Sequence, residues 1–374
     1  MKKRRFLVLF LLSSASAFGQ LNNSAFEQRM AVSEADSNKL FLGINFLGFG
    51  KNNEWFDTTV DGYTLFGYQL NPYLSYHIAK NVRLDAGVYA QKDFGNDDYS
   101  DVKPTLSLKI TNNKRNSSFI FGTLEGSVNH GLIEPLYDFE RVLNNRLENG
   151  LQMLFKEDKI SFDAWIDWQN MIYFNDTEPE RFTAGFTMNT TLFRKGGFHI
   201  DLPIQVLANH QGGQIDSVDN PVITVFNVAA GLTLEFESNR FVTAWGLKSY
   251  LPYHDTSSDD LPYQHGKGIF INPYVTTKIG LTVMGSYWWA DKFLTVQGGD
   301  LYPSINKKYP TRIDEERTIF MLRVLYDVKI ADGLILTARA EPFYDTYAEA
   351  LEYSFGLYLN FSDRFFLLNA KKNR

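Results

Sequence analysis

The sequence predicts an all-β fold, an antiparallel transmembrane β-barrel of about 16 strands with short periplasmic turns and longer external loops. Three observations predict it. Apolar and polar residues alternate along most of the 374-residue chain, the connections between these runs are short and long in turn, and the chain starts with a targeting segment. Aromatic residues make up 15% of the sequence, which fits strands that contact lipid.

Residues 1–17 have the pattern of a secretory signal peptide. Residues 2–5 are all Lys or Arg, residues 6–12 are all apolar, and Ala15-Ser16-Ala17 matches a cleavage site. Cleavage after Ala17 removes four cations and leaves a net charge near −10, which argues against nucleic acid as a partner.

Residues 18–38 are expected to form a periplasmic N-terminal segment. Phe26, Met30 and Ala31 lie at helical spacing, and Ser24 could cap a helix there. Two interpretations of this segment remain possible, a short helix and a leader without regular structure.

The barrel is predicted over residues 39–365, followed by a tail at 366–374. Alternation is clearest in the runs 66–78, 82–90, 160–168, 198–206, 320–330, 334–340 and 351–361, and weaker in 40–49. Because successive side chains of a strand point to opposite faces, one face is apolar and the other is mixed polar. Leu322, Val324 and Tyr326 should therefore face lipid. An Arg is expected to be costly at Val324 and mild at the lumen position Leu325.

The connections have the asymmetry of bacterial membrane barrels. Short ones are expected at 79–81, 112–116, 157–158, 195–196, 238–239, 278–280 and 332–333, and long polar ones at 93–102, 129–146, 174–181, 209–221, 254–267 and 291–314. A large soluble sandwich or propeller would show the same alternation, but not the signal peptide, the long strands and the loop asymmetry together. No apolar run after the signal reaches the roughly 18 residues of a membrane helix.

On these features the mature chain resembles the bacterial outer-membrane porin class, and more weakly the polysaccharide-export and capsule-assembly barrels. The resemblance is one of pattern and implies a location in the bacterial cell outer membrane. Many such barrels end on an aromatic residue, whereas Phe365 and Phe366 are here followed by eight further residues.

The inward face is where function is expected. Its charged candidates are Arg83, Asp85, Lys109, Glu125, Glu148, Asp163, Asp167, Arg323, Arg339 and Glu341. Its aromatic candidates are Tyr89, Trp165, Tyr250, Tyr274 and Trp288. Charges of both signs predict a lumen that is water-filled or laced with ion pairs. The aromatic rings suit sugar rings, or they fill wall space beside Gly residues.

The loop at 129–146 is the third external loop, which in the porin class folds into the pore. Pro135, Leu136, Phe139 and Leu143 have the spacing of a short helix. The candidate constriction residues are His130, Glu134, Asp138, Glu140, Arg141 and Arg146. The alternative is an exposed loop with ordinary surface charges.

No catalytic or metal residue is predicted. The chain lacks Cys and the common hydrolase, zinc and nucleotide motifs, so we expect no enzyme and no cofactor. Acidic residues in loops 93–101 and 255–260 leave calcium as an alternative. The predicted function is a water-filled channel for small or sugar-like solutes, with outer-membrane lipid and the small-molecule or polysaccharide solute as partners. A polysaccharide export barrel and an outer-membrane hydrolase are the alternatives.

Overall fold

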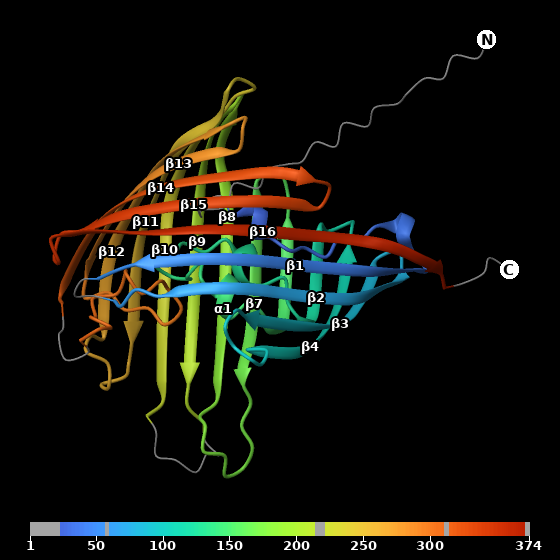
Figure 1. The fold of residues 1–374 in the computed structure, drawn as a ribbon, viewed down its shortest axis with the longest axis horizontal. Coiled ribbons are helices and arrows are strands. Elements are labelled where there is room, and N and C mark those ends of the chain that lie inside the picture. Colours follow the sequence, from blue (N-terminus) through green and yellow to red (C-terminus); the bar gives the residue numbers. More distant parts are fainter. Residues whose placement is uncertain (1–22, 57–59, 214–220, 310–313, 371–374) are drawn as a thin grey trace.

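The protein forms a closed barrel of 16 antiparallel strands in a computed structural model that describes residues 23–56, 60–213, 221–309 and 314–370. Each strand pairs with its neighbours in sequence, and the first strand pairs with the last to close the ring. The near strands in Figure 1 cross the far strands steeply, as expected for strands tilted by roughly 35–45°. The predicted fold and strand number are confirmed, and the signal peptide lies outside the described residues.

The strands are long, as a membrane crossing requires. They are β1 (Lys39–Glu54), β2 (Thr64–Ala79), β3 (Val82–Asp93), β4 (Asp101–Asn112), β5 (Ser117–Thr123), β6 (Asn149–Lys156), β7 (Ile160–Asn170), β8 (Arg181–Lys195), β9 (Phe198–Gln211), β10 (Ile223–Glu237), β11 (Val242–Thr256), β12 (His265–Thr277), β13 (Leu281–Asp291), β14 (Glu316–Ala331), β15 (Leu334–Asp345) and β16 (Ala350–Asn369). The short helical elements are η1 (Ser24–Phe26), η2 (Glu34–Asp36), η3 (Ser127–His130) and α1 (Arg141–Asn144). No helix among the described residues is long and apolar enough to cross a membrane.

The alternation sets the two faces of the wall as predicted. On β14, Leu322 is 47% exposed and Tyr326 is 40% exposed, whereas Arg323 between them is 4% exposed. Leu325 also points inward but is fully buried against Met284 of β13. The expectation that an Arg at Leu325 is mild is therefore wrong, because the lumen is packed at this point.

The C-terminal boundary also differs from the expectation. Residues 366–369 belong to β16 rather than to a tail, since Phe366 and Leu368 pair with Phe41 and Leu40 of β1. Register with the first strand, rather than the hydrophobic pattern, thus decides where the last strand ends.

The N-terminal segment lies inside the barrel, at the end that carries the short turns. Bacterial barrels place this end in the periplasm. In its described residues, 23–38, the segment holds the two short 3-10 turns η1 and η2 and no α-helix. Phe26 is buried and packs edge-on against Phe139 and Tyr358. The backbone N–H of Met30 donates to Glu125 at 2.7 Å.

The segments 124–148, 292–309 and 23–36 together fill much of the lumen. Their apolar residues join inward-facing strand residues in two buried clusters, one around Leu132, Trp288 and Phe293 and one around Phe139 and Leu143. The lumen is therefore divided by packed side chains, with cavities above and below the packing.

Candidate functional site

The loop between β5 and β6 folds into the lumen. His130, Glu134 and Glu140 are 0%, 9% and 3% exposed, so their side chains are enclosed by the wall and the other inserted segments. The predicted helix is shorter than its spacing indicates, because only Arg141–Asn144 is helical, while residues 134–136 and 139–140 form turns. The alternative of an exposed surface loop does not describe this segment. Its role as a constriction stays a prediction.

The imidazole of His130 anchors this loop to the barrel wall. Its Nδ1 lies 2.8 Å from Asp163 of β7, and its Nε2 lies 2.7 Å from Glu148. Tyr137 donates to Glu148, and Gln152 donates to Asp163 at 2.9 Å. Both carboxylates are thus fully engaged by one ring and its neighbours.

Charge rather than solvation sets the protonation of His130. Burial alone lowers the pKa of the imidazole, but the adjacent Glu148 and Asp163 carboxylates outweigh this effect and raise the pKa to about 9. The ring is therefore a cation at neutral pH and holds two anions together. A fully buried cation of this kind serves structure better than proton transfer to a substrate.

Trp165 forms a platform beneath His130. The two rings stack with centroids 3.5 Å apart and planes within 8° of each other. On the other side the indole lies against Gly185 of β8, where a Cβ atom would overlap the ring. Gly185 therefore has to be Gly for the platform, and through it His130, to keep its place.

A second constellation lines a small cavity of about 60 Å³ in the half of the lumen under the long loops, which we call the outer pocket. Glu140 accepts hydrogen bonds from Lys51 at 2.6 Å and from Asn53 at 2.8 Å, and also from the hydroxyl of Tyr63. Across the pocket, Glu134 is paired with Arg323. These contacts order two carboxylates and two cations around one space.

Tyr302, from the inserted loop between β13 and β14, completes this wall. Its hydroxyl donates to Glu134 at 2.6 Å and accepts from Arg323 at 2.7 Å. Apolar side chains of Trp55, Met321 and Phe343 line the rest of the pocket. The pocket therefore combines a charged floor with an apolar wall.

Asp138 is the carboxyl group of the outer pocket that is best suited to exchange a proton. Burial, followed by the negative charge of Glu140, raises the pKa of Asp138 to about 7. By contrast, burial would raise the pKa of Glu140, but Lys51 outweighs it and lowers that pKa. Two neighbouring acids thus have their pKa values moved in opposite directions, as in sites of acid–base chemistry.

The other predicted residues are inward but mostly engaged with one another. The contacts are Arg83 with Asp85 at 2.7 Å, Lys109 with Glu125 at 2.5 Å, Arg323 with Glu341 at 3.5 Å, Asp167 with the N–H of Asn149 at 2.8 Å, Arg339 with Asn23 at 2.6 Å, Arg141 over the ring of Tyr137 at 4.9 Å, and Arg146 with the carbonyl of Phe26 at 2.8 Å. Three of these contacts are ion pairs, and the others are hydrogen bonds or a cation–π contact. Lys51, Tyr63 and Tyr302 were missed, although the inward position of Lys51 follows from its strand register.

The predicted lumen aromatics also point inward. Trp288 is fully buried and donates from Nε1 to the carbonyl of Tyr302 at 3.0 Å. Tyr89 donates to Gln91 at 2.9 Å, Tyr250 is 1% exposed, and Tyr274 donates to Glu235. They act here as packing and hydrogen-bonding groups of the wall.

A larger cavity of about 1020 Å³ lies at the end with the short turns, and we call it the periplasmic cavity. It is lined by the N-terminal segment and by the inward ends of β7, β8 and β9. Basic side chains that line it are Arg29, Lys109, Lys156, Lys159 and Arg194. Among the described residues, the one group of three His or acidic side chains placed to share an ion is His199, Glu235 and Glu237, so neither acidic loop assembles three such ligands.

Comparison with known proteins links the chain to one family. The lipid A 3′-O-deacylase-type family matches residues 32–370. No curated protein sequence matches the chain. The expectation that the protein is not an enzyme is therefore wrong, because the matched family is one of enzymes. Short motifs could not reveal this, since none of the common hydrolase motifs is present.

Solved structures confirm the porin-like fold. The outer membrane protein OprD from Pseudomonas aeruginosa is 10% identical with a TM-score of 0.53, covering 93% of this chain and 100% of its own. Pseudomonas aeruginosa OpdL is 12% identical with a TM-score of 0.51, covering 87% and 99%. The anion-selective porin from Comamonas acidovorans is 9% identical with a TM-score of 0.51, covering 87% and 100%. The chain thus has the architecture of outer-membrane barrels.

Proposed function

Because the chain belongs to the lipid A 3′-O-deacylase-type family, we propose that it is an outer-membrane hydrolase that removes an ester-linked acyl chain from a lipid A-type glycolipid. We assign the reaction to the outer pocket. The observation that carries this assignment is Asp138, whose pKa of about 7 lies beside the ordered cations Lys51 and Arg323 in a pocket facing the loops. The solute channel is retained below as a second candidate.

The outer pocket offers the groups that ester hydrolysis needs. The Asp138 carboxylate would accept a proton from water as the water oxygen bonds to the acyl carbon. The ammonium of Lys51 and the guanidinium of Arg323 would stabilise the oxyanion that forms. The ester C–O bond then breaks, and the proton passes from Asp138 to the departing sugar oxygen. Glu140 and Glu134 hold the two cations in position.

The apolar wall of the pocket fits the acyl side of such a substrate. Trp55, Met321 and Phe343 form a continuous apolar surface beside the charged groups. A cavity of about 60 Å³ holds the ester group and a few carbons. The remaining substrate would lie against exposed loop residues such as Phe56, which is 71% exposed.

Mass spectrometry of lipid A tests this proposal. Cells that express the protein should show lipid A that has lost one acyl chain, and Asp138→Asn should abolish the loss while the barrel still forms. Asp97→Asn, in the exposed loop between β3 and β4, is the matched control and should retain activity. Unchanged lipid A with the folded wild-type protein would reject the proposal for this substrate. Full activity in Asp138→Asn would move the reaction elsewhere.

A channel for small or sugar-like solutes is the second candidate, favoured by the periplasmic cavity of about 1020 Å³ and the charged lumen. In this reading the inserted loop limits passage. Deleting residues 133–144 should raise single-channel conductance in planar bilayers, and Glu134→Gln with Glu140→Gln should weaken cation preference. Equal conductance and equal selectivity of the wild type and both variants would mean that the inserted loop does not limit passage. The channel candidate would then lose its proposed constriction, and the export alternative would be favoured.

A further inference from the structure

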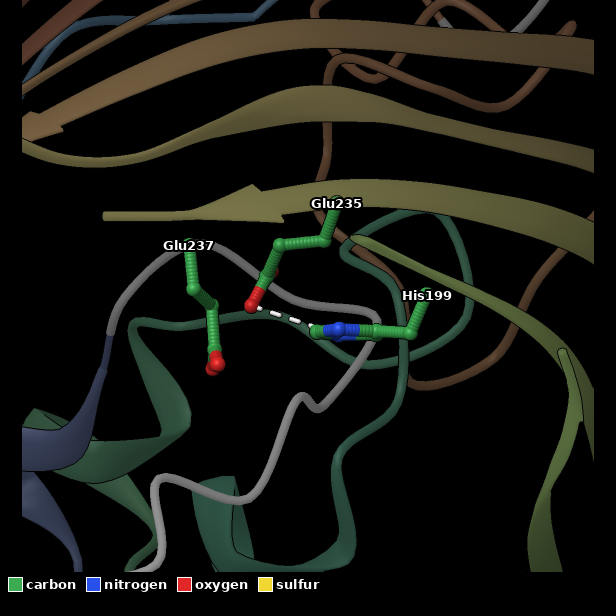
Figure 2. A group of neighbouring side chains, drawn as sticks. All are labelled: His199, Glu235 and Glu237. Carbon is green, nitrogen blue, oxygen red and sulfur yellow. Dashed lines mark ion pairs between the residues drawn. The ribbon is translucent and has the colours of Figure 1, made fainter. Parts of the chain in front are cut away.

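His199, Glu235 and Glu237 converge at the periplasmic end of the lumen, on two neighbouring strands (Figure 2). His199 is the second residue of β9, and the two Glu residues lie at the end of β10. The register pairs Glu235 directly with His199, and the N–H of Glu237 donates to the carbonyl of Gly197 at 2.7 Å. The backbone therefore fixes the positions from which the three side chains extend.

The ring nitrogen of His199 is buried without a hydrogen bond. The residue is 4% exposed, and its Nε2 has no hydrogen-bond partner in the part of the chain that the structure describes. This atom lies 3.4 Å from a carboxylate oxygen of Glu235 and 3.7 Å from one of Asp201. The other oxygen of Asp201 is likewise buried without a hydrogen bond. A buried polar atom without a hydrogen bond is costly, so the His199 nitrogen favours a ligand at this point of the wall.

We propose that His199, Glu235 and Glu237 bind a first-row transition-metal dication such as Zn²⁺. One ligand atom from each residue lies within 4.8 Å of the others. Ligands of one Zn²⁺ lie about 2.0–2.2 Å from the metal, so the three ligand atoms have to come closer together than they are in this structure. A rotation of the exposed Glu237 side chain would bring its carboxylate to that distance. An imidazole nitrogen favours Zn²⁺, Fe²⁺ or Ni²⁺ over Ca²⁺ and Mg²⁺, which prefer oxygen ligands alone.

The surroundings support the same ligand set. The hydroxyl of Tyr274 donates to Glu235 and orients that carboxylate, as outer hydrogen bonds do at metal sites. His199, Asp201 and Glu237 line the periplasmic cavity, so a hydrated ion can reach the site from the periplasm. Asp201 or water would fill a fourth position. The site lies at the opposite end of the lumen from the outer pocket, so it does not depend on the proposed hydrolysis.

Metal titration of the purified mature barrel in detergent tests the proposal. The protein is prepared without a polyhistidine tag and treated with chelator, and Zn²⁺ binding is followed by calorimetry. One Zn²⁺ per chain is expected, with X-ray absorption showing one imidazole nitrogen and the rest oxygen. His199→Ala and Glu237→Gln should each weaken binding at least about tenfold, and Tyr274→Phe should weaken it by roughly tenfold.

His265→Ala is the matched control, because His265 lies exposed on β12, near a long loop. It should bind Zn²⁺ like the wild type. Glu237→Gln changes an exposed side chain, so it tests the site even where His199→Ala fails to fold, and heat-modifiable gel migration verifies folding of each variant. No bound Zn²⁺ at micromolar concentrations, unchanged affinity in Glu237→Gln, or binding of Ca²⁺ in preference to Zn²⁺ would each overturn the proposal.

Discussion

Replacing His130 by Ala is expected to release the inserted loop from the barrel wall. The change removes a fully buried cation from Glu148 and Asp163, which remain buried with side chains 2% and 9% exposed. Removing one partner of a buried ion pair costs about 3–5 kcal/mol, because the remaining charges lose their compensation. Loss of the stacked contact with Trp165 adds about 0.5–1.5 kcal/mol. The free energy of unfolding should fall by several kcal/mol, most of it from the two unpaired carboxylates.

The effect should depend on pH in a defined direction. The pKa of His130 is raised to about 9 in the folded protein, above its value in the unfolded chain. Its contribution is therefore fully present below about pH 6.5 and is lost as the pH rises through about 9. Wild type and His130→Ala should differ most near pH 6 and least near pH 10.

Denaturant titration in detergent micelles, followed by Trp fluorescence, measures this difference at each pH. Limited proteolysis reports separately whether the loop 124–148 has left the lumen. His265→Ala, at an exposed position, serves as the control and should match the wild type throughout. An unfolding midpoint of His130→Ala equal to that of the wild type at pH 6, or a difference that does not change up to pH 10, would refute the assigned ion pairing.

Three further predictions follow from the site and the wall. The rate of deacylation should increase with pH until Asp138 is deprotonated, at about pH 7, and should then level off. Initial rates on lipid A micelles measure this pH profile, and a rate that does not change with pH contradicts the role of Asp138. Val324→Arg should lower stability by about 2–4 kcal/mol if it lies at the bilayer midplane, as measured by urea titration in vesicles, and a change below about 0.5 kcal/mol would contradict its outward position. Gly185→Ala should displace the ring of Trp165 and increase proteolysis of the inserted loop. Gly285→Ala is the control and should leave the loop protected, because a Cβ atom there would meet only Pro273 at 3.7 Å.

The lipid-facing and lumen-facing side chains of the barrel wall could be predicted, because the alternation within one strand is enough to assign its two faces. Alternation in residues 322–326 places each side chain without knowledge of any partner, and the short turns give the strand order. The contacts inside the lumen could not be predicted in this way. Glu134 meets Arg323 across 189 residues of sequence, and His130 meets Asp163 only because the loop turns inward. Such contacts depend on barrel width and loop paths, which no local pattern encodes.

Leu325 illustrates what the sequence of a single strand cannot predict. Its inward direction follows from the alternation, but its burial against Met284 depends on the neighbouring strand and on Tyr274. The His199–Glu235 pair is easier to predict than the loop contacts and harder than the faces of a single strand, because the register of one hairpin is enough to place it. That the Nε2 atom of His199 lacks a hydrogen bond, by contrast, is visible only when the surrounding side chains are in place.

The seam between β1 and β16 has a consequence for how the chain assembles. These strands join residues more than 300 positions apart in sequence, since Lys39 pairs with Asn369, so they are the last partners available to one another during synthesis. Once this seam is sealed, the wall has no lateral opening through which residues 23–36 could enter. The N-terminal segment and the inserted loops can therefore reach the lumen only through the ends of the ring, or while the strands still form an open sheet.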